Sequence, residues 1–396
     1  MRFFITGFIV VLLLQSCSHK EQPQTPYFDK GEEIFNLVWD KYRVHHHNLF
    51  SEYYPSTFTP DLTYFQEGSR EAQEVSFLWP FSGLFSSTNI LMEFDPDHYQ
   101  LYLDSMVISV EMYYDSLRKP PGYQAYPVYL DYSDRYYDDN GLVGIDYIDA
   151  YNLTNNKKYL HKAKEAMSFI MSGWCDDYGG GVSWLEGVRD QKPACTNGKA
   201  AVLALKLYKA TEDDLYLTYG KDFYHWMMNT LKDDTLHIIW NSLLTGDGSV
   251  QKHAYTYNTG TMIQSAVRLY KITEQPEYLH DARLLAEGSY SYYVKYQNGD
   301  NPYIRDLPWF IVVLFRGYHE LYMVDNNPKY INAIISMADR AWEENRDSNG
   351  LFGKEWTGKE TSENMGNWLL DESSMAELYL RIALIKGENN YVGEFN

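Results

Sequence analysis

The chain has 396 residues, and its 34 Lys and Arg against 54 Asp and Glu give a formal net charge of −20 at pH 7. This acidic balance disfavours nucleic acid as a partner, because that binding depends on neutralising phosphates with Lys and Arg. It also disfavours an anionic polysaccharide. Aromatic residues make up 16% of the chain, with 37 Tyr and 10 Trp. Most of these rings must pack between helices, but some can line a cleft for sugars, whose rings present apolar C–H faces.

The N-terminus has the pattern of a secretion signal. Residues 3–14 are almost wholly apolar, and a run of about a dozen is too short for a bilayer, which needs roughly 20. The following Leu-Gln-Ser-Cys ending at Cys17 resembles the cleavage box of bacterial lipoproteins. The resemblance implies a signal peptide over 1–17, a lipid on Cys17, and secretion to the periplasmic or cell-surface side of an outer membrane. An ordinary signal peptide with an incidental cysteine is the alternative. Residues 18–29 then form a polar tether, and residues 30–396 form one domain.

The remaining cysteines and a histidine triplet suggest no metal site. Cys175 and Cys195 can form a disulfide in an oxidising compartment, but the sequence leaves their separation open. Two cysteines cannot complete a four-ligand zinc site. The run from His45 to His47 is expected to be a solvated helical face, because adjacent residues on a helix point in different directions. No metal or organic cofactor is therefore predicted.

A repeat of about 50 to 60 residues runs through the chain. Each unit has apolar residues at helical spacing, then a short polar turn of Thr, Asn, Asp or Pro, then a second amphipathic run. Its clearest copies centre on Tyr151, Tyr208, Tyr270 and Tyr322, with a weaker copy at Phe94. Each unit therefore predicts a helical hairpin.

Five such units, with a first helix near 34–50 and a last near 371–385, make about six hairpins. Six hairpins can close into an all-α (α/α)6 barrel that stands alone as a monomer. An open solenoid, which normally binds proteins, is the alternative. Solenoid repeats run about 34 to 47 residues, whereas the links here are long, glycine-rich and aromatic, as in 173–198 and 351–367. The barrel is therefore the prediction.

Asp138 and Asp139 open the first helix of one unit. Acidic residues at such a position commonly cap a helix, which is the simplest interpretation of the pair. However, other polar and aromatic motifs recur at the same place in the repeat: 176–184 with three glycines, 257–260 and 347–352. In a barrel these loop ends face one cleft, as a sugar site requires.

The order of these motifs resembles that of glycoside hydrolase family 76 over about residues 30 to 385. The resemblance implies an (α/α)6 barrel that acts as an endo-α-1,6-mannanase, with α-mannan as the substrate. It also implies that Asp138 is the nucleophile and Asp139 the general acid/base of a retaining mechanism. Close carboxylates push each other's pKa values apart, which suits one base and one acid. The residues alone leave retention or inversion open, because neighbouring side chains on a helix diverge.

The resemblance also suggests substrate-binding residues at the loop ends. The alternative for each Trp is a core ring, and for Asp347 a loop turn. The chain departs from the family pattern at 141–143 and 185–194, and these departures bear on the sugar subsites. The predicted contacts are Tyr137 and Trp184 beside the reactive sugar, hydrogen bonds from Asn197, Tyr257 and Asn258, stacking on Trp79 and Trp309, and hydroxyl binding by Asp347.

Three other functions compete with this prediction. Epimerases, lyases and glycuronyl hydrolases also use helical toroids, but His225, His253 and His319 are scattered and the net charge disfavours acidic sugars. A non-catalytic glycan-binding lipoprotein of an uptake system would not need both carboxylates. A mannosyl transglycosidase would use the same covalent intermediate with a sugar as acceptor, and the sequence does not separate transfer from hydrolysis.

Overall fold

A computed structural model describes residues 25–66, 68–297, 299–353 and 366–388. The predicted signal peptide and Cys17 lie outside the described residues. The first helix, α1 (Tyr27–Lys41), begins inside the stretch predicted as a tether, and its Lys30 is already buried. Within the described part of the chain, no helix has both the length and the apolar character needed to cross a membrane.

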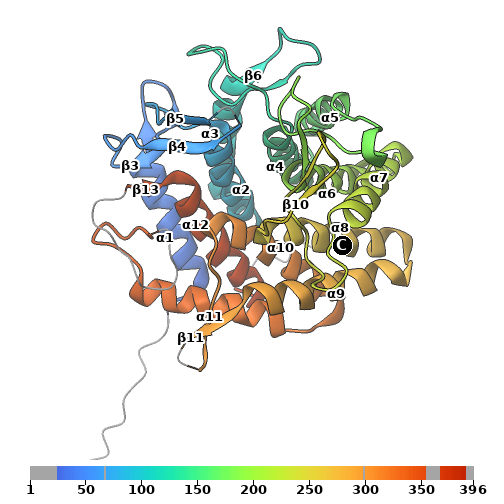
Figure 1. Ribbon diagram of the computed structural model, residues 1–396. Helices are drawn as coiled ribbons and strands as arrows, with labels where there is room; N and C mark the ends of the chain where they lie inside the picture. Colours follow the sequence, from blue (N-terminus) through green and yellow to red (C-terminus); the bar gives the residue numbers. More distant parts are fainter. Residues whose placement is uncertain (1–24, 67, 298, 354–365, 389–396) are drawn as a thin grey trace, which may run out of the picture.

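Within the described residues, six inner helices form a closed ring, whose arrangement can be followed in Figure 1. Each packs against the next along the chain, and the last packs against the first. These helices are buried on nearly all sides, which explains why most show little amphipathic contrast. The ring consists of α2 (Leu78–Phe94), α4 (Tyr137–Thr154), α6 (Ala194–Thr211), α8 (Thr256–Thr273), α10 (Pro308–Asp325) and α12 (Leu369–Ile385).

Six outer helices surround this ring, each paired with one inner helix. They are amphipathic, as in α11, where Ile331, Ile334, Ile335 and Ala338 share the buried face. Five follow their inner partner directly, and α1 packs on α12 to complete the sixth hairpin. The predicted (α/α)6 barrel is therefore confirmed. The other five are α3 (Pro96–Val110), α5 (Lys157–Ser172), α7 (Asp214–Thr230), α9 (Pro276–Tyr293) and α11 (Lys329–Glu344).

The tyrosine of each sequence repeat marks the end of an inner helix. Four inner helices end on a residue with left-handed backbone, whose N–H donates to the carbonyl of the repeat tyrosine four residues earlier. This cap stops the helix and turns the chain back at once into the outer helix. The capping residues are Asn155, Glu212, Glu274 and Asn326, with φ of 55°, 55°, 58° and 54°.

Short antiparallel strands organise the other end of the barrel. There each outer helix returns to the next inner helix through a longer connection, so the long loops gather around the N-termini of the inner helices. One three-stranded sheet joins β8 (Gln191–Pro193), β9 (Ser242–Leu244) and β10 (Val250–Gln251). The paired strands are β1 (Arg43–Val44) with β2 (Leu49–Phe50), β3 (Tyr53–Tyr54) with β13 (Asn367–Trp368), β4 (Asp61–Phe65) with β5 (Gly68–Glu71), β6 (Tyr114–Asp115) with β7 (Gly122–Tyr123), and β11 (Lys295–Gln297) with β12 (Asn301–Tyr303).

The beginning of the domain differs from the prediction. The first helix was expected near 34–50, but α1 ends at Lys41 and a hairpin of β1 and β2 follows. The histidine triplet lies in the turn of this hairpin, so its interpretation as a helical face is wrong. The turn forms because Asn48 adopts a left-handed backbone with φ of 54°. Cys175 and Cys195 are both free thiols.

Candidate active site

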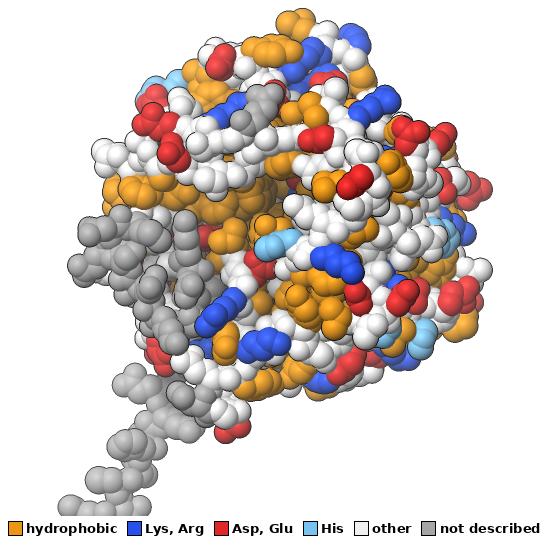
Figure 2. Space-filling model, viewed as in Figure 1, with side chains coloured by type: hydrophobic (Ala, Val, Ile, Leu, Met, Phe, Trp, Pro, Cys, Tyr) orange, Lys and Arg blue, Asp and Glu red, His pale blue; other side chains and the backbone are white. Residues whose placement is uncertain are grey.

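The first turns of the inner helices share one register at the loop-bearing end. Because these helices lie around a ring, their second and third residues occupy equivalent positions, and the rings at these positions in α2, α8 and α10 contact one another in a common floor. Figure 2 shows a hollow on the loop-bearing side of the molecule, bordered largely by hydrophobic side chains. The residue pairs at these equivalent positions are Trp79 and Pro80, Asp138 and Asp139, Cys195 and Thr196, Tyr257 and Asn258, Trp309 and Phe310, and Leu370 and Asp371.

Both oxygens of Asp138 face a hydrogen-bond donor. Trp184 Nε1 donates to Oδ1 at 2.9 Å, and Lys199 Nζ donates to Oδ2 at 3.3 Å. The Lys199 side chain is only 4% exposed, so its charge acts where water screens it little. The indole comes from the glycine-rich loop and the ammonium from α6. Together they fix the orientation of the carboxylate and match its negative charge.

The surroundings of Asp139 favour its protonated form. Burial and the adjacent charge of Asp138 raise the pKa of Asp139 well above its usual range, and Lys199 offsets only part of this rise. The cause is that a second negative charge beside Asp138 would be poorly solvated and repelled. The two neighbours thus differ in surroundings: Asp138 meets two hydrogen-bond donors, whereas burial and the charge of Asp138 favour a proton on Asp139.

The pair does not cap its helix. The N-cap residue of α4 is Tyr136, and its side chain makes no capping hydrogen bond. The hydrogen bonds of Asp138 go to Trp184 and Lys199 instead of the helix backbone. The helix N-terminus still favours a negative charge at this place. The first turn of α4 therefore presents the pair to the cleft.

A cluster of aromatic rings lines the floor beside Asp138. The centroid of Trp309 lies 5.7 Å from that of Trp79 and 5.9 Å from that of Tyr257. Lys199 Nζ lies 5.1 Å from the Trp309 ring centre, a distance at which a cation is attracted to the ring. Trp309 is only 2% exposed, so the ring that Lys199 contacts is itself fixed by packing. Trp79 is partly exposed and stacks on Phe310 at 6.1 Å.

The tyrosine beside the pair is Tyr136, not Tyr137 as predicted. Tyr137 packs on Phe169 of α5, with ring centroids 5.0 Å apart. Its ring lies against α5 because the first residue of α4 faces outward when the next two face the floor. Tyr136 instead lies 5.2 Å from the ring of Trp184. The contact of Tyr137 with the reactive sugar therefore stays a prediction that this packing does not support, whereas Trp184 lies beside the pair.

Asn197 positions a loop. It is fully buried, its Oδ1 accepts from the N–H of Val182, and its Nδ2 donates to the carbonyls of Val182 and Pro193. Asn140 has the same register in α4 and holds the N–H and carbonyl of Tyr123 in the same way. The predicted sugar contact of Asn197 does not fit these bonds. Its amide instead ties the glycine-rich loop that carries Trp184 to α6.

Asn258 and Asp347 differ in how their polar atoms are used. Asn258 is fully buried, and its amide N and O have no hydrogen-bond partner within the part of the chain that the structure describes. Its contact with substrate stays a prediction. Asp347 Oδ1 accepts from the N–H of Asn349 and of Leu351. This carboxylate therefore closes the turn that was the alternative to sugar binding.

Two charged residues of the site were missed in the sequence. Lys199 lies one helical turn after Cys195, a spacing that places both on one face of α6. This spacing could have indicated from the sequence that Lys199 belongs to the site. Glu52 carries no such signal because it precedes a two-residue strand. It is buried and accepts from the N–H of Phe77, Trp368 Nε1 and the hydroxyl of Tyr64. Burial raises the pKa of Glu52 to about 7. Its hydrogen bonds hold Tyr64, Trp368 and the backbone of Phe77 together just before α2.

A carboxylate and a neighbouring carboxylic acid on an aromatic floor are the functional groups of a glycosidase. The sequence agrees with this class. Residues 45–391 match the sequence profile of glycosyl hydrolase family 76, and the chain therefore belongs to glycoside hydrolase family 76.

Known proteins resemble the chain in fold and in sequence. A family 76 mannosidase from Bacteroides thetaiotaomicron is 26% identical, with a TM-score of 0.79 over 92% of this chain and 100% of that one. An α-1,6-mannanase from Salegentibacter is 25% identical, with a TM-score of 0.72 over 91% and 99%. A mannan endo-1,6-α-mannosidase from Saccharomyces cerevisiae is 26% identical over 30% of this chain and 28% of its own. The chain spans only 28% to 37% of the length of the curated relatives it matches.

Proposed function

We propose that the protein is a retaining endo-α-1,6-mannanase. The observation that carries this proposal is the unequal state of the pair, in which Asp138 meets two donors and Asp139 holds a raised pKa. The substrate is inferred from the relatives, one named a mannan endo-1,6-α-mannosidase and one an α-1,6-mannanase. A neutral mannan also suits a chain with a net charge of −20.

In the first step Asp138 attacks the anomeric carbon of the sugar. The glycosidic C–O bond breaks, and the proton of Asp139 passes to the departing oxygen, so that no bare alkoxide forms. The product is a glycosyl ester on Asp138. Trp184 and Lys199 hold the attacking carboxylate in place. This orientation lowers the entropy lost on reaching the transition state.

In the second step Asp139 acts as a base. Once Asp138 is an ester it has no charge, so the repulsion that raises the pKa of Asp139 disappears. Asp139, now a carboxylate, takes a proton from water as that water attacks the anomeric carbon. The ester bond breaks, Asp138 returns as a carboxylate, and Asp139 is again protonated. The same pair thus supplies an acid and then a base.

Linear α-1,6-mannan provides the direct test of this proposal. We expect the protein to release short oligosaccharides from internal sites, seen as a rapid fall in polymer size with few reducing ends. Proton NMR of the first products should show the α-anomer, because two inversions at carbon retain the configuration. A β-anomer as the first product would exclude Asp138 as nucleophile. Binding without cleavage would favour the glycan-binding alternative, and products longer than the substrate would favour transfer.

We also propose that Cys17 carries a lipid that anchors the enzyme to an outer membrane. The support is the sequence pattern of 1–17 and the polar stretch before α1. In bacteria expressing the whole chain with a fatty-acid label, the wild type should be labelled and sediment with membranes. Cys17→Ser should lose the label and become soluble, whereas Cys175→Ser should match the wild type. Label retained by Cys17→Ser, or absent from the wild type, would contradict the anchor.

A further inference from the structure

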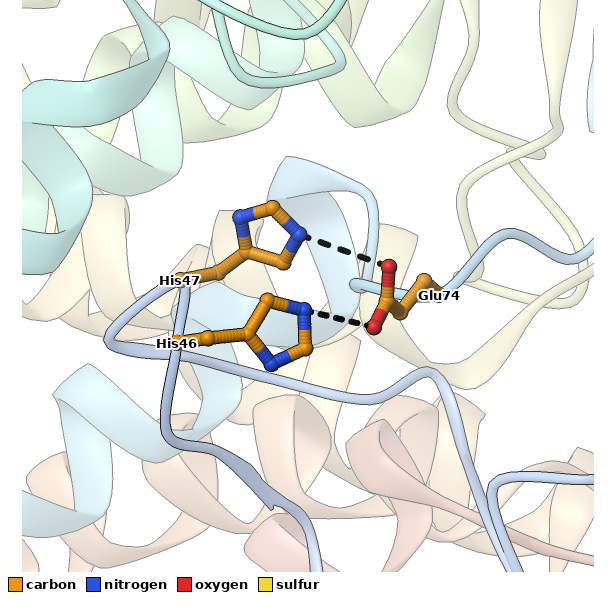
Figure 3. A group of neighbouring side chains, drawn as sticks. All are labelled: His46, His47 and Glu74. Carbon is orange, nitrogen blue, oxygen red and sulfur yellow. Dashed lines mark hydrogen bonds and ion pairs between the residues drawn. The ribbon is translucent and has the colours of Figure 1, made fainter.

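The turn between β1 and β2 brings two histidines onto one carboxylate (Figure 3). His46 Nε2 lies 2.8 Å from Glu74 Oε1, and His47 Nε2 lies 3.4 Å from Glu74 Oε2. One donor atom from each of the three residues lies within 4.8 Å of the others. Neighbouring side chains normally diverge, but the turn places these two imidazole rings 4.2 Å apart. Three ligand atoms therefore converge from two separate segments.

The surrounding structure holds His47 in an orientation suited to binding through Nε2. The hydroxyl of Tyr129 lies 2.8 Å from His47 Nδ1. An imidazole that ligates through Nε2 carries its proton on Nδ1, and an oxygen partner there fixes that tautomer. The backbone of the turn is also fixed, because the N–H of His47 donates to Val44 and that of Asn48 donates to His45. Such second-layer support is typical of metal-binding histidines.

An ion pair alone explains this arrangement poorly. If both histidines were protonated, two cationic rings would pack against each other beside a single carboxylate. The ion pair with Glu74 would offset little of this repulsion between the rings. The side chains of His46 and Glu74 are 65% and 58% exposed, and exposed ion pairs contribute little free energy. Neutral imidazoles bridged by a cation remove the repulsion and use all three groups.

We propose that His46, His47 and Glu74 form a zinc-binding site. Two imidazole nitrogens and one carboxylate oxygen suit Zn²⁺, whereas Ca²⁺ and Mg²⁺ prefer oxygen ligands alone. Tetrahedral zinc with bonds of about 2.0 to 2.2 Å needs ligand atoms roughly 3.3 to 3.6 Å apart. The exposed side chains of His46 and Glu74 can rotate until the three ligand atoms, now within 4.8 Å of one another, reach this separation. A water molecule would take the fourth position.

The site shares no residue with the catalytic pair, and its role would be in the framework. It joins the β1–β2 turn to the segment 72–77, which leads into α2 and Trp79. Through Tyr129 it also contacts the loop that runs toward α4 and Asp138. A metal here would tie together three segments that approach the cleft from different parts of the chain. Its expected effect is therefore on stability, and no reaction step depends on it.

The test is zinc titration of the whole protein against a chromophoric chelator, with thermal unfolding measured in parallel. We expect the wild type to bind one Zn²⁺ per chain and to gain about 2–4 °C in Tm at saturating zinc. His46→Ala, His47→Ala and Glu74→Gln should each weaken binding at least tenfold and abolish the Tm shift. His45→Ala is the matched control, because His45 lies in the same turn, is exposed and is no member of the cluster; it should bind as the wild type does.

Three outcomes would overturn the proposal. The first is that the wild type fails to bind zinc stoichiometrically. The second is that the three variants bind as tightly as the wild type, which would place the metal elsewhere. The third is that His45→Ala weakens binding as much as the others, which would indicate loose capture by the triplet. Circular dichroism of each metal-free variant separates loss of the site from loss of the fold, since these positions lie outside the helices of the barrel and their substitution should leave it intact.

Discussion

Replacing Asp138 with Asn should reduce hydrolysis of α-1,6-mannan by about 10⁴-fold or more, equivalent to about 5.5 kcal/mol of transition-state stabilisation. Asn cannot form the glycosyl ester, yet it keeps the shape of Asp and can still accept from Trp184 Nε1. The fold should therefore survive. The measurement is the initial rate of reducing-end release, with native mass spectrometry to show that mannotetraose still binds.

The Asp139→Asn variant should fail in a different way. Loss of the general acid should lower the rate on mannan by about 10² to 10⁴-fold. A mannosyl donor with a good leaving group, such as a fluoride, needs no protonation, so ester formation should be largely retained. Azide should then accelerate turnover and yield an α-mannosyl azide, because an anionic nucleophile needs no base. The same treatment should not rescue Asp138→Asn in this way.

A control on the same helix separates chemistry from folding. Asp146 lies on α4 about two turns further on and is buried, and burial raises its pKa well above the usual range. Asp146→Asn therefore removes a charge that burial already disfavours and should keep most of the mannanase activity. Equal losses in all three variants would mean that buried acids in α4 serve stability alone. Full activity in Asp138→Asn and Asp139→Asn would exclude the pair from catalysis.

The wild-type pH profile should reflect the raised pKa of Asp139. Its pKa lies above the usual range because of burial and the charge of Asp138, so the acid stays protonated at a pH where an exposed aspartate is ionised. Activity should therefore fall only as the pH rises through this elevated value. In Asp138→Asn the neighbouring charge is gone, and the pKa of Asp139 should decrease.

The repeat made the barrel predictable because each hairpin is specified locally. The spacing of apolar residues defines the helices, and the polar turn after Tyr151 or Tyr270 becomes a left-handed cap at Asn155 or Glu274. Six such units have few ways to bury their inner helices other than a ring. The hairpin at 43–50 was missed because two-residue strands carry no periodic signal.

The site was predictable only where the chemistry is carried by neighbours in the chain. Asp138 and Asp139 are adjacent, so a motif reveals them. The partners of Asp138 come from 46 and 61 residues away, and only the closed ring brings Lys199 to it. The prediction named Tyr137, whereas the structure places Tyr136 beside Trp184. The reason is similar, since a shift of one residue on a helix turns a side chain by about 100°. Which face meets the cleft is decided by tertiary packing.

A buried ion cluster holds the inner helices α10 and α12 together near the middle of both helices. The carboxylate of Glu377 accepts from Arg316 Nε at 2.7 Å, Arg316 Nη2 at 2.6 Å and Arg381 Nε at 2.5 Å. Burial alone would raise the pKa of Glu377, but the two guanidinium groups lower it to about 2. The pair with Arg316 crosses between two helices of the ring. It therefore stabilises ring closure directly.

Glu377→Gln should lower the free energy of unfolding by about 3–5 kcal/mol, because it leaves Arg316 and Arg381, whose side chains are only 12% and 17% exposed, without the charge of the carboxylate they share. Urea unfolding at pH 7 measures this loss. Glu287→Gln is the control: its pair with Lys329 lies at the surface, with side chains 52% and 40% exposed, and should contribute about 0–1 kcal/mol. Since the pKa of Glu377 is lowered on folding, its contribution is complete above about pH 4.5 and declines as the pH falls toward 2. The difference between wild type and variant should therefore shrink with acid, and a difference that stays constant down to pH 3 would show that Glu377 stabilises the barrel by packing and not by charge.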